Sequence, residues 1–174
     1  HITDSITYAL RIQTAILPPD RIVREYLKNS FILYLPKDIV AGDFYWMETF
    51  DDKVLFAACD CTGHGVSGAM VSVMCHTALN RSVREYGLTK PSEILDRVLQ
   101  IVQDNFSQSE EEIQDGMDAS LCCYYPNEMR LEWAGAHNPL WIIRDGAIIE
   151  YKADWQTIGK NENAQPFTNH QINL

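Results

Sequence analysis

The chain has 174 residues, of which 46% are hydrophobic and 22% charged, the composition of one ordinary globular domain. That composition excludes a disordered chain and a fibrous repeat. Aspartate and glutamate number 24 against 14 lysines and arginines, which gives a net charge of −10. General binding to nucleic acid or to an anionic membrane requires positive potential and is therefore excluded, whereas a metal site built from carboxylates is not.

The first part of the chain is basic and helical. A helix is predicted for residues 3–17, because apolar residues recur at helical spacing and two prolines follow. Residues 1–37 carry five basic and three acidic side chains, a net charge of +2, so the rest of the chain carries −12. We therefore expect a leader helix, residues 1–19, and a domain, residues 20–174. The leader either packs on the domain or ends a coiled coil that arrives from upstream, and the sequence leaves both open.

The domain begins with strand patterns. An apolar run predicts a strand at residues 31–35, and a second pattern predicts a hairpin over 43–59 with its turn at 51–53. Residues 54–59 are continuously apolar, which is typical of a central strand that is buried on both faces.

Helices follow, and then strands return. Helical spacing of apolar residues predicts helices over 65–86 and 91–106, with an acidic loop at 107–116. Further strands are expected at residues 119–125, 130–134, 140–144 and 147–151. The last two are joined by Asp145-Gly146, a strong hairpin signal, and no element is predicted after Trp155. Helices between blocks of hairpin-connected strands indicate a layered α+β fold.

Cysteine usage and hydropathy indicate the compartment. The odd set of five cysteines contains no C-x-x-C pair: Cys59, Cys61, Cys75, Cys122 and Cys123. Free, buried thiols in a reducing cytosol are therefore expected rather than zinc ligands or disulfides. No apolar run reaches 18 residues and no signal peptide is present, so we predict a cytoplasmic segment without a membrane span. Because the sequence does not begin with methionine, we expect it to be a piece of a longer protein.

Two acidic motifs carry the candidate chemistry. Asp43 follows a glycine at the start of the predicted hairpin, and Asp60 ends its buried strand in the run D-C-T-G-H-G. In a hairpin the two aspartates lie at the same end of the sheet, where their charges repel unless a cation such as Mg²⁺ or Mn²⁺ binds them. Gly63 and Gly65 allow a tight turn, and the helix N-terminus behind them favours phosphate oxygens.

Each of these residues also has a purely structural interpretation. Aspartates near turns commonly cap helices, and a single histidine such as His64 is more often a turn or packing residue than a catalytic one. The pairing of G-D-F-Y with D-x-T-G-H-G at this spacing favours a functional site.

The ordered motifs resemble the SpoIIE-like branch of the metal-dependent Ser/Thr protein phosphatases (PPM type). The resemblance runs from Ile12 to about Gly159 through A-G-D-F-Y, D-x-T-G-H-G-V-S-G-A-M, M-D-A-S-L, A-G-A-H-N-P-L and T-I-G. It implies a four-layer α-β-β-α sandwich of two antiparallel sheets flanked by helices, with metals at one sheet edge. It also implies that the leader is a linker helix to an upstream sensor domain, with homodimerisation through it as a further expectation.

The resemblance assigns roles to particular residues. Asp43 and Asp60 would bridge two Mg²⁺ or Mn²⁺ ions, with the Cys61 carbonyl as a further ligand, and His64 would act as general acid or bind metal water. His137, in A-G-A-H-N-P, is expected to order a turn beside the site.

The family completes its metal site with aspartates further along, in segments that lie beyond Leu174. Asp118 precedes a predicted strand and could approach the site, but a strand-edge role is favoured for it. We therefore expect a partial, C-terminally incomplete domain that binds metal weakly or is inactive by itself.

The sequence thus predicts a bacterial-type phosphoserine/phosphothreonine protein phosphatase domain that uses two-metal-activated water. Its substrate would be a phosphorylated regulatory protein, such as an anti-sigma-factor antagonist. One alternative is a non-catalytic regulatory or dimerisation module with the same fold, because the distal ligands are missing. Another is a hydrolase of small phosphoesters, for which the acidic chain offers little sign of a basic pocket.

Overall fold

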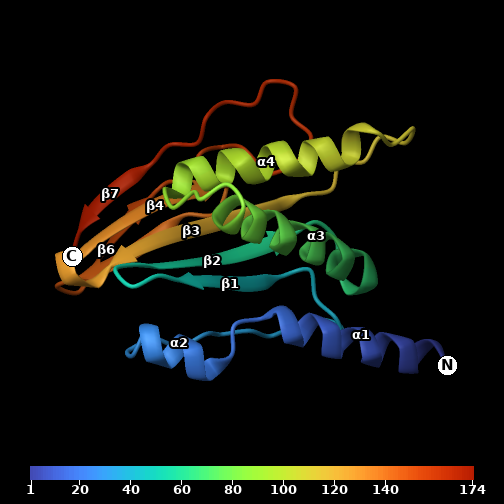
Figure 1. Cartoon of the computed structure of the whole chain (residues 1–174), viewed down its shortest axis with the longest axis horizontal. Coiled ribbons are helices and arrows are strands. Elements are labelled where there is room, and N and C mark those ends of the chain that lie inside the picture. Colours follow the sequence, from blue (N-terminus) through green and yellow to red (C-terminus); the bar gives the residue numbers. More distant parts are fainter.

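A computed structural model describes residues 1–174. Its main sheet has five antiparallel strands in the order β1-β2-β3-β4-β7 (Figure 1). The strands are β1 (Phe44–Thr49), β2 (Val54–Cys61), β3 (Met117–Tyr125), β4 (Arg130–Ala136) and β7 (His170–Asn173). A short 3-10 turn, η1 (Pro126–Glu128), joins β3 to β4. Pairing of Phe44 with Cys59 and of Thr49 with Val54 confirms the predicted hairpin.

Two long helices cover one face of this sheet. Helix α3 (Gly65–Arg84) lies over β2 and β3, and helix α4 (Pro91–Ser107) lies over β3 and β4 (Figure 1). Both helices begin and end within two residues of their predicted bounds. Alternate β2 residues such as Leu55 and Ala57 join the helices in one buried core. On α4 the side chains at helical spacing, Ile94, Leu95 and Val98, are fully buried. The apolar stripe of α4 therefore closes this face of the sheet.

A two-stranded antiparallel sheet packs on the other face. Its strands, β5 (Leu140–Arg144) and β6 (Ala147–Tyr151), are joined by Asp145 and Gly146, both of which have positive φ. Such a turn matches the natural twist of a hairpin. The inner hairpin side chains pack in a small core around the fully buried Trp133.

The α+β class with two antiparallel sheets and flanking helices is confirmed. Of the four layers expected, residues 1–174 form one helical layer and two sheets. The outer hairpin side chains stay exposed, at 62% for Trp141, 73% for Ile143 and 60% for Ile148, so no helix of the chain covers them. None of the four helices combines the length and apolar character that crossing a bilayer requires.

The leader forms helix α1 (Ile2–Ile16), followed by the short α2 (Asp20–Tyr26), which the sequence patterns did not predict. The buried Gln13 side chain docks α1 on the domain. Its amide donates to the Ala41 carbonyl at 2.6 Å and its oxygen accepts from the Ala41 N–H at 2.9 Å. Apolar side chains nearer the N-terminus, such as Ile2 and Tyr8, are 79% and 63% exposed. The end of the leader is thus packed, whereas its beginning offers an open apolar surface.

The strand predicted at residues 31–35 is wrong. Residues 27–43 contain no helix or strand, and Phe31, Leu33 and Leu35 are 91%, 78% and 83% exposed. The segment has the composition of a strand but pairs with no neighbouring strand, and a strand exists only through such pairing.

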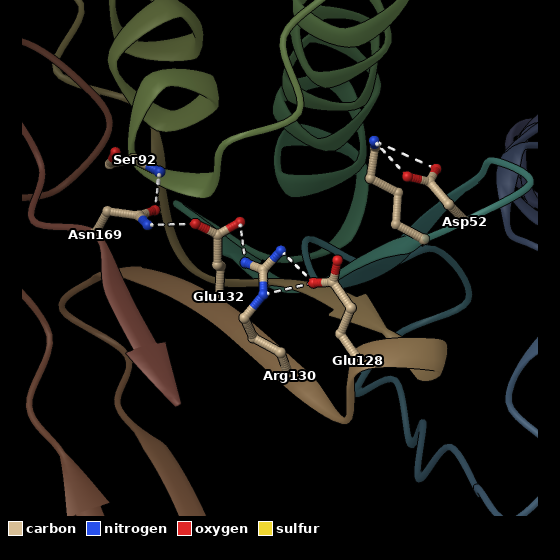
Figure 2. A network of polar contacts seen from close by, with 7 residues as sticks. Asp52, Ser92, Glu128, Arg130, Glu132 and Asn169 are labelled. Atoms are coloured by element: carbon tan, nitrogen blue, oxygen red, sulfur yellow. Dashed lines mark hydrogen bonds and ion pairs between the residues drawn. The ribbon is translucent and has the colours of Figure 1, made fainter. Parts of the chain in front are cut away.

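The end of the chain is more ordered than its polar sequence indicates. Ile158, Phe167 and Ile172 are buried, and β7 pairs with β4. Figure 2 shows the polar contacts that hold this segment: the Asn169 side chain accepts from the Ser92 N–H and donates to Glu132. Glu132 in turn contacts Arg130 at 3.3 Å. These contacts attach β7 to the start of α4, at the end of the sheet opposite Asp60.

Candidate active site

Three aspartates lie in one row across neighbouring strands. Asp60 pairs directly with Asp118 of β3, and Asp43 immediately precedes Phe44, the partner of Cys59. Side chains alternate along a strand, and the neighbours Phe44, Cys59, Cys61 and Met117 all enter the helix-covered core. The three carboxylates therefore lie on the opposite face, which α3 and α4 leave open. The sequence predicted that Asp43 and Asp60 lie at the same end of the sheet, and the register places Asp118 beside them as well.

The pKa of Asp60, the central residue of this aspartate row, is affected by its two neighbours. The pKa of Asp60 is raised, first by burial, then by the hydrogen bond and charge of Asp43, and finally by the charge of Asp118. These causes all oppose the ionised form, because they remove water from the carboxylate or place negative charge beside it. A cation bound between these groups would reverse the effect.

The loop that carries Asp43 packs closely against the backbone after Asp60. A Cβ added to Gly42 would lie 2.8 Å from the Gly63 carbonyl oxygen and 3.1 Å from the Cys61 carbonyl oxygen. Only glycine fits there, so Gly42 lets the Cys61 carbonyl lie beside the aspartate row. The sequence patterns did not indicate this packing role of Gly42.

The Cys61 side chain belongs to the core, not to the site. All five cysteines are free and buried. The pKa of the Cys61 thiol is raised by its hydrogen bond to Cys75 and by burial, so the thiol stays protonated and inert. Only the main chain of this residue borders the candidate site.

The turn between Asp60 and α3 has the expected glycine geometry. Gly63 and Gly65 have φ values of 87° and 60°, in the region that favours glycine. Helix α3 begins at Gly65 without a side-chain cap, which leaves the amide groups of its first turn available to an anion.

His64 pairs with an acid that the sequence did not single out. Its Nδ1 lies 2.9 Å from Asp38 Oδ2, and Asp38 belongs to the loop that leads to Asp43. No periodicity or motif marks Asp38, because its position depends on how an irregular loop folds back over the start of α3.

His137 lies at the other end of the aspartate row. Its φ is 60°, its Nδ1 lies 3.2 Å from Asp118 Oδ1, and its ring packs 4.6 Å from the Trp155 ring. His137 thus has a left-handed backbone conformation and contacts Asp118. Trp155 was not predicted to approach the site and is 91% exposed.

A shallow cavity of about 260 Å³ adjoins Asp43 and Asp60. Residues 32–36 form one wall, and Asn138 lies on its lining. The Tyr34 hydroxyl donates to the Asp43 carbonyl oxygen at 2.9 Å, which ties that wall to the aspartate row. A larger cavity, of about 560 Å³, lies beyond the end of α4 beside Glu110–Glu112 and Lys160, and none of the aspartates lines it.

The oxygen donors fit a hard divalent cation only in part. Carboxylates and a carbonyl are the ligands that Mg²⁺ and Mn²⁺ prefer, and such ions retain several waters. However, no three His, Cys, Asp or Glu side chains converge closely enough to hold a metal ion by themselves. Side chains of residues 1–174 thus supply part of a ligand set.

Comparison with known proteins identifies the family of the chain. Residues 51–174 match the family model of stage II sporulation protein E (SpoIIE). The chain belongs to the SpoIIE family. No curated protein sequence matches it significantly.

Solved structures of SpoIIE-like and other PP2C domains share the fold of this SpoIIE-family chain. The SiaA PP2C domain of Pseudomonas aeruginosa matches 99% of the chain at 32% identity, with a TM-score of 0.86. The PP2C phosphatase domain of SpoIIE from Bacillus subtilis, solved with a fragment of its regulatory domain, matches 78% at 16% identity and TM-score 0.62. RsbX in complex with magnesium matches 77% at 17% identity and TM-score 0.57. The chain spans 67%, 39% and 61% of those three chains.

Proposed function

We propose that the chain is part of a metal-dependent phosphoserine/phosphothreonine protein phosphatase. The observation that carries the proposal is the row of Asp43, Asp60 and Asp118 beside the glycine turn that opens α3. Membership of the SpoIIE family supports it, as does the 32% identity to the SiaA PP2C domain. The magnesium in the RsbX structure supports a divalent cation.

Asp43, Asp60 and the Cys61 carbonyl would hold two Mg²⁺ or Mn²⁺ ions. When bound, such ions lower the pKa of water and neutralise phosphate charge. Gly63 and Gly65 allow the backbone amide groups at the start of α3 to approach phosphate oxygens.

His64 would act as the general acid. As water attacks phosphorus and the bond to the serine oxygen breaks, the imidazolium gives its proton to that oxygen. The products are the free serine hydroxyl and inorganic phosphate, and one water molecule is consumed.

A phosphorylated regulatory protein is the proposed substrate class, in the manner of an anti-sigma-factor antagonist. The cavity beside Asp43 and Asp60 is shallow, which suits a phosphorylated side chain on a protein surface better than a small molecule that must be enclosed. The leader would receive the signal of an upstream sensor domain, and its exposed residues Ile2 and Tyr8 offer a surface for a homodimer. The buried free thiols suit the cytoplasm.

The test is Mn²⁺-dependent release of phosphate from a serine-phosphorylated protein. It uses the complete gene product, in the native form and as Asp60→Asn, with Asp51→Asn in the distant β1–β2 turn as the matched control. We expect Asp60→Asn to reduce activity by a factor of about 100 or more and the control to retain it. Equal activity of the Asp60 variant and the native protein contradicts the proposed metal site.

A non-catalytic module with the same fold is the second candidate. It is favoured by the absence of three converging metal-binding side chains. Calorimetric titration of the complete gene product with Mn²⁺ separates the two: heat of binding that Asp60→Asn abolishes supports the enzyme, and no binding supports the module.

A further inference from the structure

The contact between Asp38 and His64 has the geometry of an orienting pair. Asp38 Oδ2 lies 2.9 Å from His64 Nδ1, and no other carboxylate oxygen lies within 4.0 Å of either ring nitrogen. The contact joins the loop before β1 to the residue that precedes α3. It thus connects the loop that carries Asp43 with the candidate general acid.

The contact fixes the position of a proton on the imidazole. Carboxylate oxygens only accept hydrogen bonds, so Nδ1 must carry the hydrogen that it donates to Asp38. In the neutral ring Nε2 then has the free lone pair, and in the imidazolium Nε2–H is the proton available for transfer. This is the relation by which an aspartate orients the histidine of a serine protease.

Backbone geometry brings Asp38 to this place. A Cβ added to Gly65 would meet only Asp38, with Oδ2 at 3.5 Å, and Gly65 has a φ of 60°. The carboxylate therefore lies against the first residue of α3, where the helix dipole favours negative charge. His64 itself is held by the helix start, where its carbonyl accepts from the Ser67 hydroxyl at 3.1 Å.

The ion pair between Asp38 and His64 contributes little to the stability of the fold. The side chains of His64 and Asp38 are 72% and 41% exposed. Exposed ion pairs contribute little to folding, because water competes for both groups and two side chains lose freedom. The contact therefore contributes little to the stability of the fold.

We propose that Asp38 is the positioning residue of the site: it holds His64 as the Nδ1–H tautomer and turns Nε2 outward, toward the oxygen of the leaving serine or threonine. The inference rests on the proposed function for its catalytic consequence, whereas the tautomer can be measured without any activity. After proton transfer the neutral ring keeps its hydrogen bond to Asp38, so it needs no rearrangement.

The first experiment measures the ring ¹⁵N chemical shifts of His64 in residues 1–174 at about pH 8, where an ordinary histidine is neutral. We expect the Nδ1-protonated form in the native chain and in Asp38→Glu, which keeps a carboxylate, and a shift toward the Nε2-protonated form in Asp38→Ala. Glu48→Ala is the control, because Glu48 forms an ion pair of the same length, 2.9 Å, with Arg84. This variant should leave the tautomer of His64 unchanged. An unchanged tautomer in Asp38→Ala overturns the inference.

The second experiment measures phosphatase kinetics of the complete gene product. We expect Asp38→Ala to lower kcat roughly 10-fold or more with little change in KM, and Asp38→Glu to recover most of the loss. A tautomer that depends on Asp38, together with an unchanged kcat, overturns the positioning role. If the native protein has no activity while the tautomer still depends on Asp38, the proposed function fails and the orienting contact stands.

Discussion

Replacement of Asp60 by Asn should stabilise the metal-free protein while abolishing its response to metal. Asp60 lies between Asp43 and Asp118 in the aspartate row, and its pKa is raised by burial and by both neighbours. Folding thus places this carboxylate where its charge is unfavourable. Asparagine has nearly the same shape and removes the charge.

The size of the effect follows from the strand spacing. Neighbouring strands lie about 4.8 Å apart, and two unit charges at about 5 Å repel by roughly 0.8 kcal/mol at the dielectric of water and roughly 3 kcal/mol at a dielectric of 20. The Asp60 carboxylate is partly desolvated, but its side chain still lies exposed on the open face of the sheet, so the lower figure applies to each neighbour. We expect Asp60→Asn to raise the free energy of unfolding by about 1–2 kcal/mol, which corresponds to a Tm increase of about 2–8 °C.

The pH dependence has a definite sign. A raised pKa means that the folded state binds the proton of Asp60 more tightly than the unfolded state does. Stability of the native protein should therefore fall as the pH rises from the ordinary carboxyl pKa of about 3.9 through the raised value. The extra stability of Asp60→Asn over the native protein should be absent below a pH of about 3.9 and fully present above the raised pKa of Asp60.

Urea denaturation of residues 1–174, followed by circular dichroism in EDTA and then in Mn²⁺, measures both effects. A ligand at 100 times its Kd stabilises by about 2.7 kcal/mol, and this gain should be absent from the variant. Asp51→Asn, in the exposed β1–β2 turn, serves as the control. A variant that is less stable than the native protein in EDTA at neutral pH would refute the electrostatic reasoning.

Three further changes test the packing around the site. Gly42→Ala should destabilise the fold by about 1–3 kcal/mol and weaken Mn²⁺ binding, because the added Cβ would meet two carbonyl oxygens. Urea denaturation measures the loss of stability and calorimetry measures the metal affinity. An unchanged affinity for Mn²⁺ would contradict the proposed role of Gly42. Leu95→Ala should cost about 2–5 kcal/mol in urea denaturation because the side chain is fully buried, and a loss below about 1 kcal/mol would show that the α4 core is loosely packed. Gln13→Ala removes the bonds to Ala41 and should speed amide hydrogen exchange in α1 while leaving β2 protected; unchanged exchange in α1 would mean that Gln13 does not dock the leader.

The elements that the sequence predicted best are those whose local pattern agrees with their packing. Helices α3 and α4 have long apolar faces, and the Asp145-Gly146 turn specifies its hairpin without help from the rest of the chain. The strand predicted at residues 31–35 was wrong because an apolar run indicates a strand only if a neighbouring strand can pair with it, and none does here. Strand β7 was missed because its four residues are mostly polar and depend on β4 and Asn169 for their position.

The candidate site was predictable where it lies in contiguous motifs. Asp43, Asp60 and the glycine turn are visible in the sequence, since a hairpin brings its two ends together. The position of Asp118 requires the register between β2 and β3, which no local pattern supplies. The contact of Asp38 with His64 could not be predicted for another reason. Asp38 lies in an irregular loop, and the course of that loop depends on its contacts with the start of α3.

Strand β2 limits which insertions and deletions the protein can tolerate. Asp60 faces the open side of the sheet, while Cys59 and Cys61 face the core. Because side chains alternate, one residue inserted between Val54 and Asp60 would turn the carboxylate into the apolar core and a thiol toward the site. An insertion of two residues would restore the face but would move Asp60 about 7 Å along the strand, out of the row that it forms with Asp43 and Asp118. The length of this strand is therefore constrained more tightly than the identity of its exposed residues.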